Sequence, residues 1–261
     1  MYGIHRKAHH HHRRRRGNEA FVTREEALVP SMIDTPDLGA MAKLLSKRFG
    51  CRGFQPNPVA RSIIHRIVTL AQLTASWCNS QPWQVVITEG AGTERFRRAL
   101  FDHATAQPAS APAQFDFPGP QYSGAYKERR REVGWQLYQS VGVARGDRVG
   151  AARQALENFR LFGAPHVAII STDRDLGVYG AIDCGAYVSN FALLAQSLGV
   201  ASIPQAALAH YSPFVRQYFD LGEDRQIVCG ISFGYEDASH AANQFRTGRA
   251  NPDEAVTWVV D

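Results

Sequence analysis

Residues 178–198 constrain the fold more than any other part of the chain. The stretch is almost entirely apolar and is followed by Gly199, a common helix stop. Its small side chains are those of Ala181, Gly185, Ala186, Ser189, Ala192 and Ala195. A helix that is apolar on nearly every side is buried in a core or against another subunit. The sequence therefore predicts a long helix in one of these two settings.

Apolar periodicity predicts further helices interrupted by few strands. The expected helices are 38–49, 58–76, 93–101, 126–141, 153–162 and 212–219, and the expected strands are 83–88, 167–171 and 226–233. Without regular strand–helix–strand units, this order indicates an α+β layered fold rather than a doubly wound parallel sheet. No Gly-x-Gly-x-x-Gly turn opens a helix after a strand. A nicotinamide dinucleotide would therefore bind only transiently, at another cofactor.

Composition indicates a globular intracellular protein. The chain has 261 residues, of which 44% are hydrophobic, enough for a sizeable core. No run reaches the roughly 18 consecutive apolar residues of a membrane span, and no apolar stretch follows the first charges, so we expect neither a span nor a signal peptide. The four scattered cysteines are typical of reduced thiols in the cytoplasm.

The net charge of +5 belongs to the first residues of the chain. Residues 1–16 contain six of the 29 Lys and Arg residues and no acid, which leaves 23 basic against 24 acidic residues elsewhere. We interpret residues 1–37 as a disordered, basic and His-rich extension with a linker, and residues 38–261 as one domain, and we expect no nucleic-acid partner. Residues 104–125, rich in Pro, Ala and Gly, form either an active-site lid or a plain surface loop.

Three separated segments carry groups suited to a phosphate-bearing planar ligand. Residues 47–52, Lys-Arg-Phe-Gly-Cys-Arg, hold two guanidinium groups around a glycine, and residues 244–249, Gln-Phe-Arg-Thr-Gly-Arg, repeat the pattern near the other end. Two such pairs facing each other would neutralise a phosphate monoester. Between them, residues 75–83, Ala-Ser-Trp-Cys-Asn-Ser-Gln-Pro-Trp, fill a helix-to-strand turn with small and amide side chains. Such a turn offers the hydrogen bonds that the edge of a heterocycle requires.

These segments, in this order, resemble the nitroreductase family. Its members begin with Arg-Arg-Ser-x-Arg, continue with a Pro-Ser-x-x-Asn-x-Gln-Pro-Trp turn and end in a basic stretch closing on Arg-x-Pro-Leu. The stretches 199–208 and 230–235 look like the family's flavin-side loop and the strand before the basic end. Within the family, the chain is most similar to bacterial NADPH-dependent enzymes that act on nitrobenzoates and dinitroanilines.

The resemblance implies an α/β/α sandwich with a mixed, mainly antiparallel sheet, FMN at the interface of an intertwined homodimer, and a ping-pong reaction. NADPH or NADH would reduce the flavin, and a nitroaromatic or quinone-like acceptor would then reoxidise it. A nitro group would be reduced to a hydroxylamine or an amine. We name no catalytic acid or base, since flavin N5 would carry the hydride and protons can come from solvent, and no metal is expected. The implied cofactor-binding residues are Arg48, Phe49, Gly50, Arg52, Ala75, Ser76, Trp77, Asn79, Pro204, Gln205, Ala206, Ala207, Arg246, Thr247 and Arg249.

In this implied site, Ala75 to Asn79 come from the partner subunit, and the amides of Ala206 and Ala207 point at flavin N5. The chain departs from the family pattern where Gly50 replaces Ser, where Ala75 replaces Pro and where Asn251 interrupts the final motif. Aromatic residues for an acceptor pocket, or equally for a core, are Tyr122, Tyr126, Trp135 and Tyr138.

Two alternatives remain open at this point. One is another flavoenzyme of the same fold that fragments flavin, removes halide or reduces quinones or flavins. The other is a non-enzymatic flavin-binding redox module.

Overall fold

The computed structural model describes residues 35–107, 115 and 122–260. The chain divides into two compact units, Thr35–Arg249 and a second unit made of Met1–Asp34 with Ala250–Asp261. In the described part of the second unit, Asn251 caps a short turn, η6 (Pro252–Glu254), by accepting a hydrogen bond from the Asp253 amide at 3.0 Å. The expected extension 1–37 lies outside the described residues except for 35–37.

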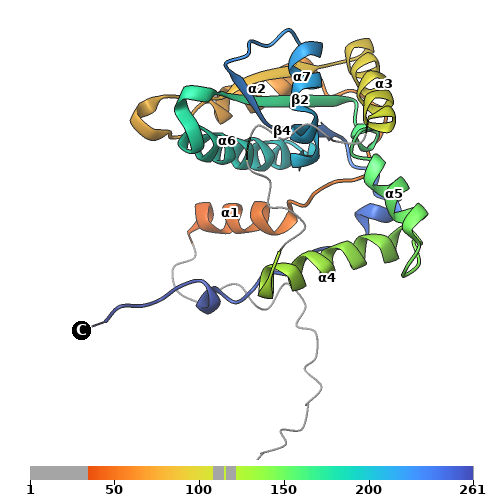
Figure 1. The fold of residues 1–261 in the computed structure, drawn as a ribbon. Helices are drawn as coiled ribbons and strands as arrows, with labels where there is room; N and C mark the ends of the chain where they lie inside the picture. The colour runs from red at the N-terminus through yellow and green to blue at the C-terminus, as the bar shows by residue number, and fades with distance from the viewer. Residues whose placement is uncertain (1–34, 108–114, 116–121, 261) are drawn as a thin grey trace, which may run out of the picture. The chain divides into compact units, whose positions relative to one another are not determined.

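A four-stranded antiparallel sheet forms the centre of Thr35–Arg249 (Figure 1). The strands are β1 (Gln84–Thr88), β2 (His166–Asp173), β3 (Ala201–Gln205) and β4 (Arg225–Gly234), in the order β1-β2-β4-β3. The strands predicted at 83–88, 167–171 and 226–233 are confirmed. Within the stretch 199–208, expected as a loop, residues 201–205 instead form β3 and pair with Gly230–Gly234 of β4. Pro204 is tolerated there because β3 is an edge strand, where a missing N–H costs no ladder bond.

Helices cover both faces of the sheet and make the three-layer α/β/α sandwich. One layer holds α2 (Arg61–Ala71) and α6 (Gly177–Ser197), which share a buried cluster with Ala168, Ile170 and Ile231 of the strands. The opposite layer holds α3 (Ala91–Ala106), η4 (Ala206–Tyr211) and α7 (Ser212–Tyr218). These pack on Val167, Ile169 and Ile227.

A β-bulge lets β4 serve both layers. Ile170 pairs with Cys229 but Ser171 pairs with Ile227, so Val228 is an extra residue in β4. An extra residue reverses which side of the strand the following side chains occupy. Ile227 therefore packs under α3 and α7, whereas Cys229 and Ile231 pack under α6.

The helix predicted at 178–198 is confirmed as α6, with six fully or nearly fully buried residues facing the sheet. Within the described residues, the stretch Arg174–Ser197, which adds the turn η3 (Arg174–Leu176), is long and apolar enough to span a membrane by length and composition alone. Core helices share this composition. Its packing against β2 and β3 buries the face that carries Cys184, Tyr187 and Phe191.

Three helices lie outside the two layers and bury no residue fully: α1 (Pro36–Lys47), α4 (Gly124–Ser140) and α5 (Arg148–Leu156). Thr35 caps α1 by accepting a hydrogen bond from the Leu38 amide at 3.2 Å. α1 contacts α6, α5 contacts α3, and α4 contacts the short turn η5 (Ala241–Asn243). Of the loop expected at 104–125, residues 104–106 belong to α3 and 124–125 to α4, and residues 108–114 and 116–121 lie outside the described part.

Candidate functional site

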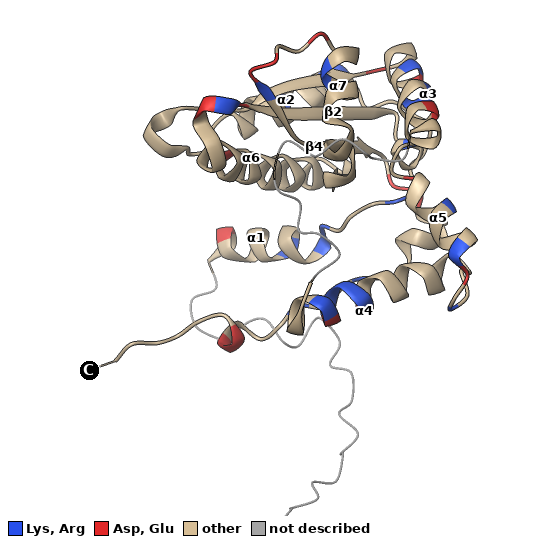
Figure 2. Ribbon diagram, in the orientation of Figure 1, with Lys and Arg blue, Asp and Glu red and all other residues tan. Residues whose placement is uncertain are grey.

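The segment after α1 joins the edge of the sheet and carries the first arginines. Gly50 forms a parallel bridge with Ser202 of β3, and the Cys51 amide donates to the Ser202 carbonyl at 3.2 Å. A Cβ built at Gly50 would lie 3.5 Å from the Ile203 side chain, an ordinary contact distance. The backbone here therefore tolerates a side chain. Figure 2 shows the basic residues at the end of α1 and on the segment that follows.

Arg52 is a half-buried cation with no acidic partner among the described residues. Its backbone amide donates to Asn243 Oδ1 at 2.7 Å, and its guanidinium lies 5.9 Å from the centre of the Phe162 ring. The one hydrogen bond of the guanidinium, to the Gly50 carbonyl, is long at 3.5 Å. Burial lowers the pKa of Arg52, as expected when a charge loses solvent without gaining an anion.

Asn243 joins this segment to the C-terminal part of the same unit. Its side-chain amide donates to the carbonyls of Gly53 and Asp237, both at 2.9 Å, while its Oδ1 accepts from Arg52. Gly53 is packed so closely that a Cβ would lie 2.2 Å from the His240 ring. Sequence reasoning missed Asn243. The only signal was a turn-forming residue directly before the basic motif at 244–249.

The structure brings Arg246 to the first segment but leaves Arg249 apart. The Arg246 guanidinium lies 3.6 Å from the centre of the Phe49 ring and donates to the Asn243 carbonyl at 2.6 Å. Arg249 is exposed and donates only within its own segment, to Thr247 Oγ1 at 2.9 Å and to nearby carbonyls. The Arg52 amide and the Arg246 guanidinium both bind Asn243, so the two distant segments meet at this residue. That their guanidinium groups share one phosphate stays a prediction. No ion pair of Arg48, Arg52, Arg246 or Arg249 occurs among the residues described.

The turn at 75–83 is held by hydrogen bonds from several sides. The short helix η1 (Trp77–Asn79) starts where the Trp77 amide donates to Asp183 of α6 at 3.1 Å. Ser76 Oγ accepts from the Gln81 amide at 2.9 Å. The buried Arg225 donates to the Pro82 carbonyl at 3.2 Å.

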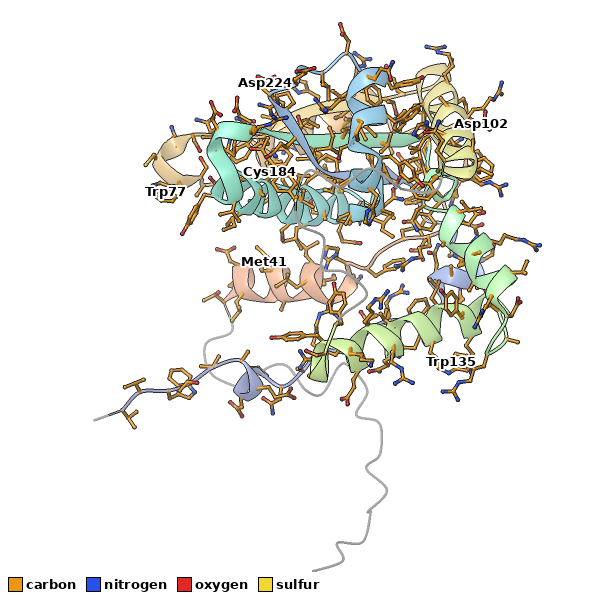
Figure 3. The ribbon with its side chains drawn as sticks, in the orientation of Figure 1. Met41, Trp77, Asp102, Trp135, Cys184 and Asp224 are labelled. Carbon is orange, nitrogen blue, oxygen red and sulfur yellow. The ribbon has the colours of Figure 1, made fainter. Side chains whose placement is uncertain are left out.

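This turn is strained, because three of its non-glycine residues have left-handed backbone. The φ angles are 51° at Cys78, 56° at Asn79 and 46° at Gln81. Such conformations cost free energy and persist only where surrounding contacts fix them. The Trp77 ring meets Tyr179 edge-on with centroids 4.4 Å apart, yet Trp77 is 57% exposed (Figure 3). Ala75, Trp77 and Asn79 are all exposed and available for a ligand.

The turn and the arginine segment lie at opposite ends of α6. Trp77 contacts Tyr179 and Asp183 near the start of the helix, whereas Gly50 and Arg52 lie by Ser202, beyond its last residue. From Asp183 to Ser197 the helix rises about 21 Å, at about 1.5 Å per residue. Within one chain, the turn at 75–83 and the segment of Gly50 and Arg52 are therefore separated by about two-thirds of the length of α6.

The end of β3 presents the third group. Pro204 and Ala206 are exposed, and Ala207 is half-buried in η4. Gln205 is buried, and its side chain points inward, where its Nε2 donates to the Asn158 carbonyl at 2.9 Å and its Oε1 accepts from Ser232 Oγ. The structure therefore assigns the Gln205 side chain to internal contacts rather than to an open ligand surface.

The four aromatic residues expected in an acceptor pocket all lie on or just before α4, and none belongs to the core. Tyr126 is 68% exposed, and Arg130 lies 5.5 Å from the Tyr122 ring centre. Trp135 packs under Arg145, also at 5.5 Å. Nine residues separate Tyr126 from Trp135, which is two and a half helical turns and places them on opposite faces. Within one chain, Tyr126 and Trp135 thus do not line one pocket. Tyr138 is half-buried near the end of the helix.

The fold and site define a three-layer sandwich suited to a phosphate-bearing cofactor, and comparison with known proteins identifies its class. Residues 45–235 match the Nitroreductase family, and the chain belongs to this family. It is 36% identical over 228 residues to the nitroreductase NfnB of Mycolicibacterium smegmatis, covering 86% of this chain and 95% of that protein. It is 31% identical over 245 residues to a 4-nitrobenzoate reductase of a Nocardioides species, covering 92% and 98%.

A solved structure agrees. The crystal structure of the FMN-dependent NfnB from Mycobacterium smegmatis in complex with NADPH superposes with a TM-score of 0.80 at 31% identity, covering 85% of this chain and 99% of that one. The family resemblance drawn from the three sequence segments is therefore confirmed, as is the expected fold.

Proposed function

We propose that the protein is an FMN-dependent nitroreductase that takes hydride from NAD(P)H and reduces nitroaromatic compounds to hydroxylamines or amines. Family membership, the FMN and NADPH of a structural relative and the nitrobenzoate substrate of a sequence relative support this function. The observation that carries it is that Arg52 and Arg246, from distant segments that meet at Asn243, have no acidic partner among the described residues.

The residues present fit FMN. Its phosphate carries about −1.5 to −2 charges at neutral pH. The guanidinium groups of Arg52 and Arg246, which form no ion pair among the described residues, would donate to it, with Arg48 nearby in sequence. The Gly50 backbone lies beside these groups on the edge of β3. From Ser202, β3 leads over about 13 Å to Ala206, at about 3.3 Å per residue. A ligand anchored at Arg52 would thus have to extend about this distance along β3, of which only Pro204 is exposed, to reach Ala206 and Ala207.

We propose a homodimer in which Ala75, Ser76, Trp77 and Asn79 of one copy complete the site begun by Arg52 of the other. The separation of the two groups along α6 prevents one chain from holding both ends of one flavin. Apolar side chains suited to a subunit interface are about half exposed on α1, namely Leu38, Met41 and Leu45. On α6, Val178, Tyr179 and Ile182 are exposed to a similar or greater extent.

The bound flavin would accept hydride from the nicotinamide and pass reducing equivalents to the acceptor. The protein's part is positional and electrostatic. Arg52 and Arg246 hold the anionic end, the amides of Ala206 and Ala207 face the reacting edge, and the strained turn at 75–79 closes the site from the second copy. NAD(P)H and the acceptor would use the same slot in turn, giving ping-pong kinetics. Tyr122, Tyr126, Trp135 and Tyr138 are proposed to contact the acceptor from different copies, as their opposite faces require.

We place the protein in the cytoplasm, with no membrane or nucleic-acid partner. All four cysteines are free, and three of them are buried, in keeping with a reducing compartment. Burial raises the pKa of the Cys51 thiol to about 11, so it is not a reactive thiolate.

The absorption spectrum of the purified protein, followed during anaerobic titration, tests the proposed function. We expect flavin absorption that NADPH bleaches and a nitroarene such as 4-nitrobenzoate restores, with the amine or hydroxylamine as product. A protein that stays colourless after incubation with FMN would contradict the flavin assignment. A yellow protein that NADPH bleaches but only quinones reoxidise would contradict the substrate class.

A further inference from the structure

The turn that links α5 to β2 contains a second constrained segment, at a place the expected site did not include. Residues 157–163 include the short helix η2 (Leu161–Gly163), with left-handed φ angles of 56° at Leu161, 52° at Phe162 and 77° at Gly163. Leu161 and Phe162 are buried in two different core clusters. The turn is therefore fixed to the body of the protein, and Phe162 lies against Arg52.

Asn158 is the polar anchor of this turn. Gln205 Nε2 donates to the Asn158 carbonyl at 2.9 Å and to its side-chain oxygen at 3.3 Å. The Asn158 side chain in turn donates to the Ala155 carbonyl at 3.1 Å, which satisfies the last turn of α5. Ser232 of β4 completes the chain by donating to Gln205 Oε1. The Gln205 side-chain amide thus joins β4 to the end of α5, with its oxygen bound to Ser232 and its nitrogen bound to Asn158.

This chain of bonds holds more than a turn. We define the arm as α4 and α5, residues 124–156, which carry Tyr126, Trp135 and Tyr138. No residue of the two helices is fully buried, and their main contacts with other elements are with α3 and η5. An element with few buried contacts opens easily, so each hydrogen bond that ties its end to the body of the protein matters more for holding it in place. Asn158 lies two residues after the end of the arm, and Gln205 lies directly before Ala206. The bond between them therefore ties the end of the arm to the Ala206–Ala207 edge.

We infer that Gln205 and Asn158 are positioning residues that set the orientation of the arm relative to the Ala206–Ala207 edge and so determine which aromatic acceptors the site accepts. This inference rests on the proposed function for its acceptor. Neither residue touches the reacting atoms. Their effect reaches the acceptor through α5 and α4, so their loss should alter acceptor affinity more than hydride transfer from NADPH.

The test uses full-length protein and two substitutions of Gln205. Gln205→Met keeps the side-chain length and removes both hydrogen bonds, whereas Gln205→Glu keeps the acceptor for Ser232 and removes the donor to Asn158. Thr93→Val is the control, because it removes a buried hydrogen bond between Thr93 and Thr88, 2.8 Å long, in a region remote from Gln205 in the sheet. Each variant is measured by hydrogen exchange of its backbone amides and by steady-state kinetics with 4-nitrobenzoate and with a small quinone.

Both Gln205 variants should exchange faster across residues 124–156, with β1 and β2 unchanged, and should raise the KM for the nitroarene about fivefold. That factor equals about 1 kcal/mol, the usual net worth of one hydrogen bond. The rate of flavin bleaching by NADPH and the flavin content should stay near those of the parent. Thr93→Val should lower the melting temperature without changing the exchange of the arm or the KM.

Unchanged exchange in the arm, or faster exchange with an unchanged KM, would overturn the inference. So would an equal effect of Thr93→Val, since that would trace the change to general destabilisation. If the parent protein reduces no nitroarene, the proposed function is wrong. The hydrogen exchange of residues 124–156 in the Gln205 variants then still tests whether Gln205 holds the arm in place.

Discussion

Arg52 and Arg249, one from each of the two basic segments expected to bind phosphate, have different surroundings. Arg52 is half-buried, rests against Phe162 and carries its backbone bond to Asn243. Arg249 is exposed and bonds only to its neighbours in sequence. A cation withdrawn from water without an anion costs free energy, so Arg52 should gain more from a bound phosphate than Arg249 does. The folded protein, on the other hand, should depend on Arg249 very little.

Arg249→Ala should therefore leave folding intact and reduce flavin retention. Its side chain contributes no packing that the substitution would remove, so the melting temperature of the flavin-free protein should stay the same. Flavin content after gel filtration should fall severalfold, in line with the loss of a charge-assisted bond. Arg174→Ala, which removes an exposed arginine bonded to the Glu223 carbonyl, is the matched control. Equal flavin in parent and Arg249→Ala would remove Arg249 from the site.

Gly50→Ser should strengthen flavin binding. The ideal Cβ has only ordinary contacts, at 3.5 Å to Ile203 and 3.7 Å to the Arg52 guanidinium, and Gly50 is not left-handed. The added hydroxyl would stand where the family usually has one. We expect an FMN dissociation constant lower by about fivefold, since a net hydrogen bond is worth about 1 kcal/mol. Fluorescence titration of the flavin-free protein measures it, and weaker binding would show that the hydroxyl points elsewhere.

His166 should make stability depend on pH. Its Nε2 accepts from the Val59 amide at 2.9 Å, so Nδ1 carries the proton and donates to the Thr88 carbonyl at 3.1 Å. Burial lowers the pKa of His166, and the unfolded chain therefore takes up a proton first, at about pH 6.5. The contribution of His166 is present above that pH and is lost as the pH falls.

Urea unfolding at a series of pH values between about 8 and 5 measures this effect. The free energy of unfolding should decrease below about pH 6.5 in the parent, and the decrease should be smaller in His166→Gln. The substitution itself lowers stability at every pH, so the slope is the informative quantity. A parent and a variant with the same slope would assign the pH dependence to other groups.

At the scale of elements, local pattern predicted the existence of helices and strands, and tertiary contacts decided where they end. Asn57 and Pro58 have the residue types of a helix start, yet α2 begins at Arg61 and the Val59 amide donates to His166 Nε2. The same helix ends at Ala71 rather than near Ser76. At this end the Thr74 hydroxyl donates to the Ala71 carbonyl at 2.6 Å. The apolar periodicity of the sequence does not predict these hydrogen bonds.

The helix predicted at 153–162 shows the same limit. Its start was missed although Asp147 caps it by accepting from the Gly150 amide at 2.8 Å, and α5 ends at Leu156. The apolar residues that extended the predicted helix, Leu161 and Phe162, instead turn into two core clusters. β3 was missed because small residues and Pro204 give a weak strand signal, and its pairing with β4 supplies what the sequence lacks.

The junction of the two segments at Asn243 is an element-level prediction. Asn243→Ala would leave the Arg52 amide and the carbonyls of Gly53 and Asp237 without their partner in a buried place. We expect a loss of about 2–4 kcal/mol in the free energy of unfolding, measured by urea denaturation, because each unmet buried group costs about 1–3 kcal/mol. Gln244→Ala, at the exposed neighbouring position, is the control. A change below about 0.5 kcal/mol, the range of surface substitutions, would show that the junction is not fixed by Asn243.

At the scale of the whole molecule, the chain carries two parts of one site that it cannot bring together alone. The sequence motifs predicted the family and the two groups of residues, because arginine pairs and the Asn-x-Gln-Pro-Trp turn are local features. Their separation along α6 is a property of the fold and was not visible in the motifs. The inward direction of Gln205 is likewise visible only in three dimensions. The opposite faces of Tyr126 and Trp135, by contrast, follow from their nine-residue spacing on the predicted helix.

Complementation between two defective chains tests the shared site most directly. Arg52→Ala removes one half and Asn79→Ala the other, and each variant alone should bind little FMN. When the two are coexpressed with different affinity tags and the mixed dimer is isolated, one of its two sites should carry both defects and the other none. We predict about half of the parent's flavin content and NADPH-dependent bleaching in the mixed dimer. Flavin no higher in the mixed dimer than in either variant alone would show that both segments serve the same site within one chain, contrary to this account.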